Sequence, residues 1–201
     1  MLDGTLRSFI EPPLDRLGRR LVRAGVSANA MTLGGFAIGL LALPLLAAGA
    51  YGGALVAILI NRLADGLDGA IARRRGASDL GGYLDIVCDF MFYGAVVFGF
   101  ALAAPDNGLA AAFLLLAFIG TGGSFLAFAA MAARRKIETR SRGPKSLYYL
   151  GGLTEGTETI AFFVACCIFP GAFVPLAWIF AAACWITTAT RVLSAWRMLG
   201  P

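Results

Sequence analysis

Hydrophobic residues gather into long runs along this chain, and charged residues lie mostly in the short segments between the runs. Each run is close to the roughly 20 residues that an α-helix needs to cross about 30 Å of hydrocarbon. Backbone polar groups inside lipid must be satisfied within the segment, so each run is expected to be a helix. The pattern predicts an all-α polytopic membrane protein with six transmembrane helices, over about residues 29–48, 53–73, 81–104, 108–133, 150–169 and 173–196.

The first 26 residues differ from the rest because polar and apolar positions are mixed there. Pro12 and Pro13 are suited to the first turn of a helix. At helical spacing, leucines then share one face and arginines the other: Leu14, Leu17 and Leu21 against Arg16, Arg19, Arg20 and Arg23. We expect the segment 1–26 to contain a short amphipathic helix that begins at these prolines and lies on anionic lipid, with an ordinary solvated helix as the alternative. Residues 27–201 are expected to form the six-helix transmembrane domain.

Composition and charge agree with a membrane protein. The 201 residues are 59% hydrophobic, with mean hydropathy +0.77 and formal net charge +5, which excludes an ordinary soluble domain. The connectors at residues 50–52, 105–107 and 170–171 contain no Lys or Arg, whereas the remaining connectors and the N-terminal segment are basic. The positive-inside rule therefore predicts an integral cell (inner) membrane protein with both termini in the cytoplasm.

Four aspartates interrupt the second and third apolar runs. Asp65 and Asp68 are three residues apart, and Asp85 and Asp89 are four apart, so each pair lies on one face of its helix. An ionisable residue in a transmembrane segment costs about 2.5–3.5 kcal/mol on insertion scales, and it indicates function by default. Four carboxylates in one space would repel one another, so the pattern predicts bound cations or shared protons.

The residues around these aspartates favour a hard metal ion and a phosphate ligand. The chain has no histidine, and carboxylates alone suit Mg²⁺, Mn²⁺ or Ca²⁺. Magnesium usually keeps some positions for water and substrate phosphate, so four Asp suffice for one or two ions. Gly69 and Ala72 are small enough to let a ligand approach the helix backbone, and Arg73 supplies a planar cationic fork for phosphate.

This stretch resembles the signature of the CDP-alcohol phosphotransferase (CDP-alcohol phosphatidyltransferase) family. The family motif reads Asp-x-x-Asp-Gly-x-x-Ala-Arg, then eight residues, then Gly-x-x-x-Asp-x-x-x-Asp. Here seven residues separate the two halves, and the missing one falls in the predicted turn. The matching positions are Asp65, Asp68, Gly69, Ala72, Arg73, Gly81, Asp85 and Asp89.

The resemblance implies a cytoplasmic active site in which CDP-diacylglycerol and a small polar alcohol react and CMP is released. Two ions, Mg²⁺ or Mn²⁺, would clamp the pyrophosphate, with Asp89 as the general base. The implied metal ligands are Asp65, Asp68, Asp85 and Asp89. The implied nucleotide-binding residues are Asp65, Asp68, Gly69, Ala72, Arg73 and Gly81. The family likeness also implies a homodimer, with membrane lipids but no nucleic acid as partners.

The acceptor alcohol is less well defined by the sequence. In family members with phosphorylated acceptors, basic residues on the later helices hold the phosphate, which here points to Arg134, Lys136 and Arg191. Glycerol 3-phosphate is the preferred acceptor, and inositol phosphate, inositol, serine and ethanolamine remain open. Glu155 and Glu158 suit either the start of the fifth helix or an acceptor amine.

Two other classes of protein compete with the enzyme. A cation transporter would use the aspartates as an ion site, but it would not require Gly69, Ala72 or Arg73 beside them. A catalytically silent membrane protein would bind the nucleotide lipid without turnover. At the first apolar run, Ser27 is a plausible N-cap, and Asn29 and Thr32 are expected to serve the helix start rather than the site.

Overall fold

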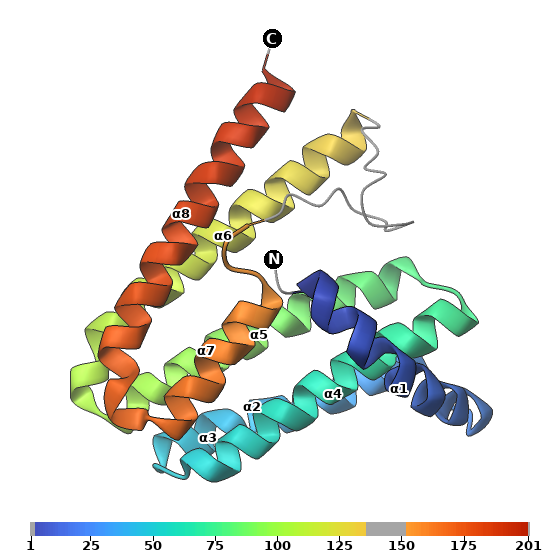
Figure 1. The fold of residues 1–201 in the computed structure, drawn as a ribbon, viewed down its shortest axis with the longest axis horizontal. Helices are drawn as coiled ribbons and strands as arrows, with labels where there is room; N and C mark the ends of the chain where they lie inside the picture. Colours follow the sequence, from blue (N-terminus) through green and yellow to red (C-terminus); the bar gives the residue numbers. More distant parts are fainter. Residues whose placement is uncertain (1–2, 136–151, 201) are drawn as a thin grey trace.

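The computed structural model describes residues 3–135 and 152–200, with side chains from residue 11 onward, and this part contains helices and no strands. Its α-helices are α1 (Asp3–Arg23), α2 (Ala28–Leu40), α3 (Ala42–Ala47), α4 (Tyr51–Arg75), α5 (Asp79–Ala103), α6 (Gly108–Arg134), α7 (Gly156–Ile168) and α8 (Phe173–Leu199). Short 3₁₀ turns at Pro105–Asn107 and Pro170–Ala172 precede α6 and α8. The predicted all-α class is confirmed (Figure 1).

Four stretches of the described chain are long and apolar enough to cross a membrane: Ala28–Ala47, Asp79–Ala103, Pro105–Arg134 and Pro170–Leu199. The first of them combines α2 and α3. The 25-residue α4 is also long enough, but Arg62, Asp65 and Asp68 make it more polar than the other four. By contrast, α7 has only 13 residues, so the predicted full-length span over 150–169 is not confirmed, and neither is the count of six.

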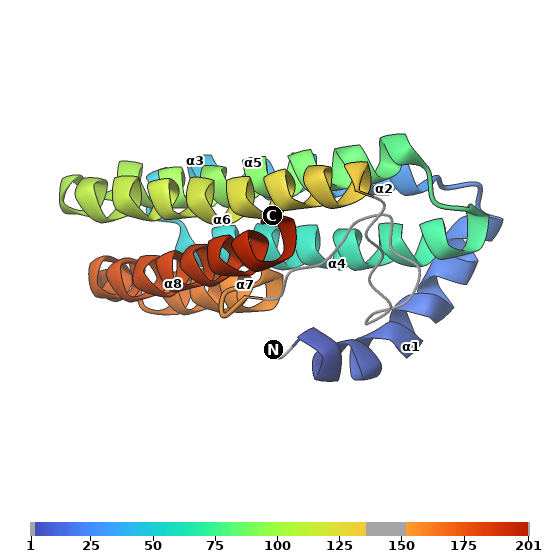
Figure 2. The same ribbon diagram turned by 90° about the horizontal axis from the view of Figure 1, so that it is seen from above.

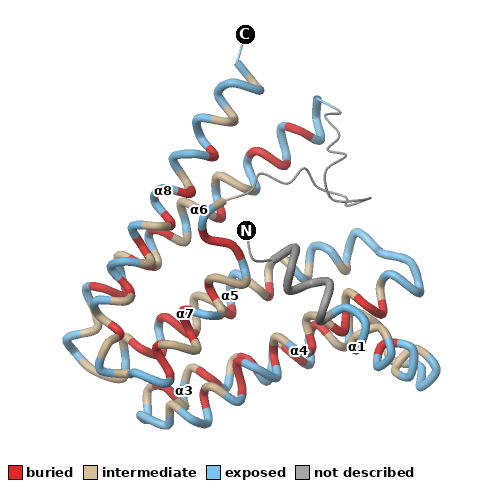
Figure 3. The backbone as a smooth tube through the Cα atoms, viewed as in Figure 1, coloured by how far each residue is buried: buried red, intermediate tan, exposed pale blue. Residues whose placement is uncertain are grey.

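The helices pack as two groups joined through α5 and α7. Within the first group, α2 packs along α4, α3 packs against α5, and α1 crosses α4. Within the second, α6 and α8 pack along each other, while α7 contacts both α4 and α8. Figure 1 shows the C-terminal ends of α6 and α8 extending away from the remaining helices, and Figure 3 shows that these ends are largely exposed.

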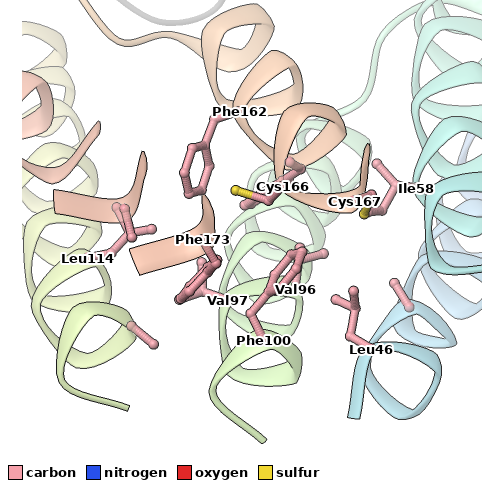
Figure 4. Packing of buried hydrophobic residues seen from close by; sticks show 14 of the residues in the cluster. Leu46, Ile58, Val96, Val97, Phe100, Leu114, Phe162, Cys166, Cys167 and Phe173 are labelled. Carbon is pink, nitrogen blue, oxygen red and sulfur yellow. The ribbon is translucent and has the colours of Figure 1, made fainter. Parts of the chain in front are cut away.

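The hydrophobic core lies between α3, α4, α5, α6, α7 and α8 and is rich in aromatic rings (Figure 4). Phe100 and Phe173 stack with their centroids 4.7 Å apart, and Phe162 stacks on Phe180 at the same distance. On α5 this core begins at Phe92, one turn beyond Asp89. The core therefore fixes one half of α5, and the aspartates occupy the other half.

The N-terminal helix begins earlier than the prolines suggest. α1 starts at Asp3 and continues through Pro12 and Pro13, so the predicted start at these prolines is wrong; proline dihedral angles remain compatible with a helix although each ring removes an N–H donor. Gly18 lies against Ala70 of α4, where a β-carbon would come within 3.0 Å of the Ala70 methyl group. Contact with anionic lipid stays a prediction for α1.

Candidate active site

A tight turn joins the two aspartate helices. Gly76 ends α4 with φ +98°, a conformation that favours glycine. Ser78 then caps α5, its Oγ accepting a hydrogen bond from the Gly81 N–H at 3.0 Å. The seven residues between the two halves of the motif thus contain this turn, and both halves of the motif remain helical.

The two aspartate helices do not pack directly along each other. Instead, α2 packs against both α4 and α5, and the backbones of α4 and α5 stay apart, so that these two helices meet through side chains such as Arg62 and Asp89. In Figure 2 the turn joins them at one end. The space between the two helices is a small pocket lined by side chains of α2, α4 and α5.

Three of the four aspartates converge in that space. Carboxylate oxygens of Asp65, Asp68 and Asp85 lie within 4.8 Å of one another, with Asp68 buried, Asp65 half-buried and Asp85 exposed. Thr32 of α2 donates a hydrogen bond from Oγ1 to Asp68 Oδ2 at 2.6 Å and so fixes that carboxylate. An all-oxygen donor set of this size, reachable from one side, fits a divalent ion that keeps positions for water or phosphate.

The fourth carboxylate, Asp89, lines the same pocket but is bound differently. Its Oδ1 accepts a hydrogen bond from Arg62 Nη2 at 2.6 Å, and its Oδ2 accepts one from the Tyr93 hydroxyl at 3.3 Å. Asp89 is therefore held one helical turn from Asp85 by two donors. The residues around the pocket are Thr32, Phe36, Asn61, Arg62, Asp65, Asp68, Asp85, Cys88 and Asp89.

Thr32, Asn61 and Arg62 were not predicted as residues of the site, yet all three line the pocket. Asn61 is 4% exposed and donates from Nδ2 to the Gly35 carbonyl at 3.0 Å. The sequence did carry a signal, because Asn61 and Asp65 are four residues apart on one face of an otherwise apolar helix. No such spacing links Thr32 to Asp68, since they belong to different helices.

The residues expected to bind the nucleotide lie beyond the carboxylates, toward the α4–α5 turn. A β-carbon on Gly69 would have only Arg73 Nη1, at 3.5 Å, as a described neighbour, so the helix surface is open there. Arg73 is exposed and faces Asp15 of α1, with Nη2 and Oδ1 3.4 Å apart. Ala72 is half-buried, and Gly81 lies close to the Asn29 side chain. Within the described chain, these four are not part of the pocket lining.

The residues expected to bind the acceptor are more distant. Arg134 is exposed at the last turn of α6, and Lys136 lies outside the described residues. Arg191 is buried in α8 at 7% exposure and donates from Nη1 to the Thr121 carbonyl of α6 at 2.9 Å. Neither Arg134 nor Arg191 belongs to the described lining of the carboxylate pocket.

The two glutamates of the predicted fifth span form the start of a helix. Glu155 is the N-cap of α7, and its side chain and that of Glu158 form a reciprocal capping box. Glu158 Oε2 accepts the Glu155 N–H at 3.1 Å. The interpretation of these residues as a helix terminus is confirmed.

Comparison with known sequences agrees with this geometry. Residues 26–193 match the CDP-alcohol phosphatidyltransferase family, and the chain belongs to that family. It is 58% identical over 200 residues to Inner membrane protein YnjF of Escherichia coli, covering 99% of this chain and 97% of that one. It is also 35% identical over 98 residues to Archaetidylinositol phosphate synthase of Pyrococcus horikoshii, covering 48% of this chain and 52% of the other.

Solved structures of a similar fold include phosphatidylinositol phosphate synthase of Mycobacterium tuberculosis. With CDP-DAG bound, that enzyme is 25% identical and superposes with a TM-score of 0.67, covering 91% of this chain and 93% of the other. In complex with manganese and citrate, it is 26% identical with a TM-score of 0.71, covering 91% and 88%. The protein is thus a membrane enzyme of the CDP-alcohol phosphatidyltransferase class, a transferase of phospholipid biosynthesis.

Proposed function

We propose that this enzyme transfers a phosphatidyl group from CDP-diacylglycerol to a small polar alcohol and depends on Mg²⁺ or Mn²⁺. The observation that carries the proposal is the approach of Asp65, Asp68 and Asp85 to within 4.8 Å, beside a fourth carboxylate, between two helices of a membrane-embedded fold. The similar mycobacterial enzyme was solved with CDP-DAG in one structure and with manganese in another. A site near the ends of membrane helices would suit a donor with acyl chains and a charged nucleotide.

Asp65, Asp68 and Asp85 would hold the metal, with Thr32 keeping the Asp68 carboxylate in place. When bound, the ion supplies positive charge that stabilises the pyrophosphate as CMP leaves. The cytidine nucleotide would lie toward the α4–α5 turn, along Gly69, Ala72 and Gly81. There Arg73 would exchange its surface ion pair with Asp15 for a substrate phosphate.

Asp89 is the proposed general base. It accepts the proton of the acceptor hydroxyl as that oxygen forms a bond to the lipid-side phosphorus. The bond from this phosphorus to the bridging oxygen breaks, and CMP leaves with that oxygen. Tyr93 and Arg62 orient the Asp89 carboxylate. Little other chemistry is needed, because phosphoryl transfer depends mainly on positioning and charge stabilisation.

Glycerol 3-phosphate is the proposed acceptor, which would make the product phosphatidylglycerophosphate. Its phosphate would lie toward the basic ends of α6 and α8, where Arg134, Lys136 and Arg191 are the proposed binding residues. Inositol phosphate is the second candidate, because the similar pyrococcal and mycobacterial enzymes are both named as inositol phosphate lipid synthases. Both acceptors carry a phosphate that basic side chains would recognise.

The inner membrane is the proposed location, since the E. coli relative is named for it. We place both termini and the active site on the cytoplasmic side, because the positive-inside rule predicts that basic connectors face the cytoplasm. There the pocket would receive nucleotide-linked lipid and a soluble alcohol together. A homodimer is also proposed, on the family likeness alone.

The test is CMP release by purified protein supplied with CDP-diacylglycerol, Mn²⁺ or Mg²⁺ and one alcohol at a time. The panel is glycerol 3-phosphate, inositol phosphate, inositol, serine and ethanolamine. We expect rapid, metal-dependent release with glycerol 3-phosphate and none after chelation of the metal. If CMP is released with inositol phosphate alone, inositol phosphate and not glycerol 3-phosphate is the acceptor. If no alcohol leads to CMP release, the proposed function is wrong.

A further inference from the structure

Arg62 is an unusual residue in this pocket, because it is a cation among four carboxylates. It lies on α4 one turn before Asp65, and its side chain is 16% exposed. A guanidinium in a transmembrane helix is costly unless it has partners. Among the residues the structure describes, it is the one cationic side chain in the pocket lining.

The guanidinium is fixed from several sides. Asn61 Oδ1 accepts hydrogen bonds from Arg62 Nε at 2.9 Å and Nη2 at 2.6 Å, and Asn61 is itself tied to the Gly35 carbonyl of α2. The guanidinium carbon lies 4.9 Å from the centre of the Phe92 ring and 5.5 Å from that of Tyr93. Such contacts with ring faces attract a cation. Arg62 is thus held in place by side chains of α4 and α5.

Arg62 lies between Asp89 and Asp65, which is one of the three proposed metal ligands. Its Nη2 lies 2.6 Å from Asp89 Oδ1, and its Nη1 lies 3.6 Å from Asp65 Oδ2. A second divalent ion that bridged Asp65 and Asp89 would have to occupy this same region. Like charges at such short distances repel strongly in a poorly solvated site, so the guanidinium and a second ion exclude each other.

We propose that Arg62 takes the place of a second metal ion, so that each chain binds a single divalent ion at Asp65, Asp68 and Asp85. This inference rests on the metal site of the proposed function and narrows the expected two ions to one. Arg62 then acts as a positioning residue: it keeps Asp89 out of the metal's coordination shell and free to accept a proton. The positive charge that a second ion would supply is instead part of the protein.

The test is the number of Mn²⁺ ions bound per chain, measured on the purified full-length protein by electron paramagnetic resonance of free Mn²⁺. Wild type is expected to bind one ion and Arg62→Met two, because the neutral side chain leaves the Asp65–Asp89 pair to a metal. Arg74→Met is the matched control, since Arg74 also pairs with an aspartate, Asp15, but at the surface of the same helix. It is expected to bind one ion. Two ions in wild type, or one in a folded Arg62→Met protein, would overturn the proposal.

A second variant keeps the proposal testable if Arg62→Met does not fold. Asp89→Asn is expected to bind one Mn²⁺ with an affinity within about threefold of wild type, because Asp89 is not a metal ligand in this arrangement. If Asp89 were a metal ligand, its removal would weaken Mn²⁺ binding at least 10–100-fold, because that loss is already typical when a residue that only orients a metal ligand is removed. A tenfold loss in Asp89→Asn would therefore overturn the proposal. No Mn²⁺ binding by wild type would overturn the metal site of the proposed function as well, whereas two ions would overturn the role of Arg62 alone.

Discussion

At the scale of single residues, the site separates four chemically identical side chains into two roles. Asp65, Asp68 and Asp85 share one small space, whereas Asp89 is bound by Tyr93 and Arg62. The difference comes from neighbours on other turns and other helices. The spacing of the aspartates predicted their faces correctly, but it did not distinguish the roles.

Asp89→Asn should reduce kcat at least about 100-fold, because a positioned general base contributes roughly 10²–10⁴-fold. The amide retains the size of the carboxylate but does not accept the proton of the acceptor hydroxyl. Binding of CMP by the variant, measured by calorimetry, should remain near that of wild type. A kcat equal to that of wild type would show that Asp89 is not the general base.

Thr32→Val should weaken Mn²⁺ binding about tenfold, because partners that orient metal ligands are worth 10–100-fold in affinity. The substitution keeps the shape of the side chain and removes the 2.6 Å hydrogen bond to Asp68. Thr188→Val is the control, since the Thr188 hydroxyl bonds only the Cys184 carbonyl of its own helix in the described structure. Equal Mn²⁺ affinities for the two variants would show that Thr32 does not support the metal site.

At the scale of helices, small residues on α2 determine how close α4 can approach. Gly35 and Gly39 are one turn apart and face Ala64 and Asn61 of α4. Small residues at this spacing let membrane helices pack with their backbones close together. The same contact brings Thr32 to Asp68 and the Gly35 carbonyl to Asn61, so the packing of α2 builds part of the site.

Gly35→Ala should therefore destabilise the protein by about 1–3 kcal/mol, the usual cost of overpacking. A β-carbon there would collide with the Ala64 methyl group. Gly34→Ala is the matched control, because nothing described lies within 4 Å of a β-carbon at that position. Thermal unfolding in detergent should show a lower Tm for Gly35→Ala alone. Equal Tm values for both variants would contradict the close α2–α4 contact.

The apolar runs predicted most helices but not the true length of each one. Helical spacing correctly placed Asp65 with Asp68, and Ser27 caps α2 as expected. The run over 150–169 predicted a full span, yet α7 begins only at Gly156. Hydropathy does not show where a backbone enters a helix, whereas the capping box of Glu155 and Glu158 does. Contacts between helices, such as Thr32 with Asp68, depend on tertiary packing that no periodicity reveals.

At the scale of the whole molecule, the proposed metal site would lie near the cytoplasmic surface, with the aromatic core deeper along the helices. α5 carries both, with Asp85 toward the α4–α5 turn and Phe100 in the core. The core holds one end of the helices together, and the aspartate pocket lies toward the α4–α5 end. Substrates are thus expected to enter from the cytoplasmic side and from the bilayer.

The sidedness is testable with single cysteines, because the four native cysteines are buried. Ala77→Cys in the α4–α5 turn should react with a membrane-impermeant maleimide only in inside-out vesicles. Gly52→Cys, at the start of α4, should react only in right-side-out cells or spheroplasts. Both positions are exposed in the structure. The opposite labelling pattern would reverse the proposed orientation and place the site outside the cytoplasm.

The central claim is that aspartates from two helices converge to bind a divalent ion. The most direct measurement is anomalous scattering at the manganese edge from crystals of this protein grown with Mn²⁺. We expect a manganese peak in contact with carboxylate oxygens of Asp65, Asp68 and Asp85. Manganese bound elsewhere, with these three side chains turned apart, would contradict it.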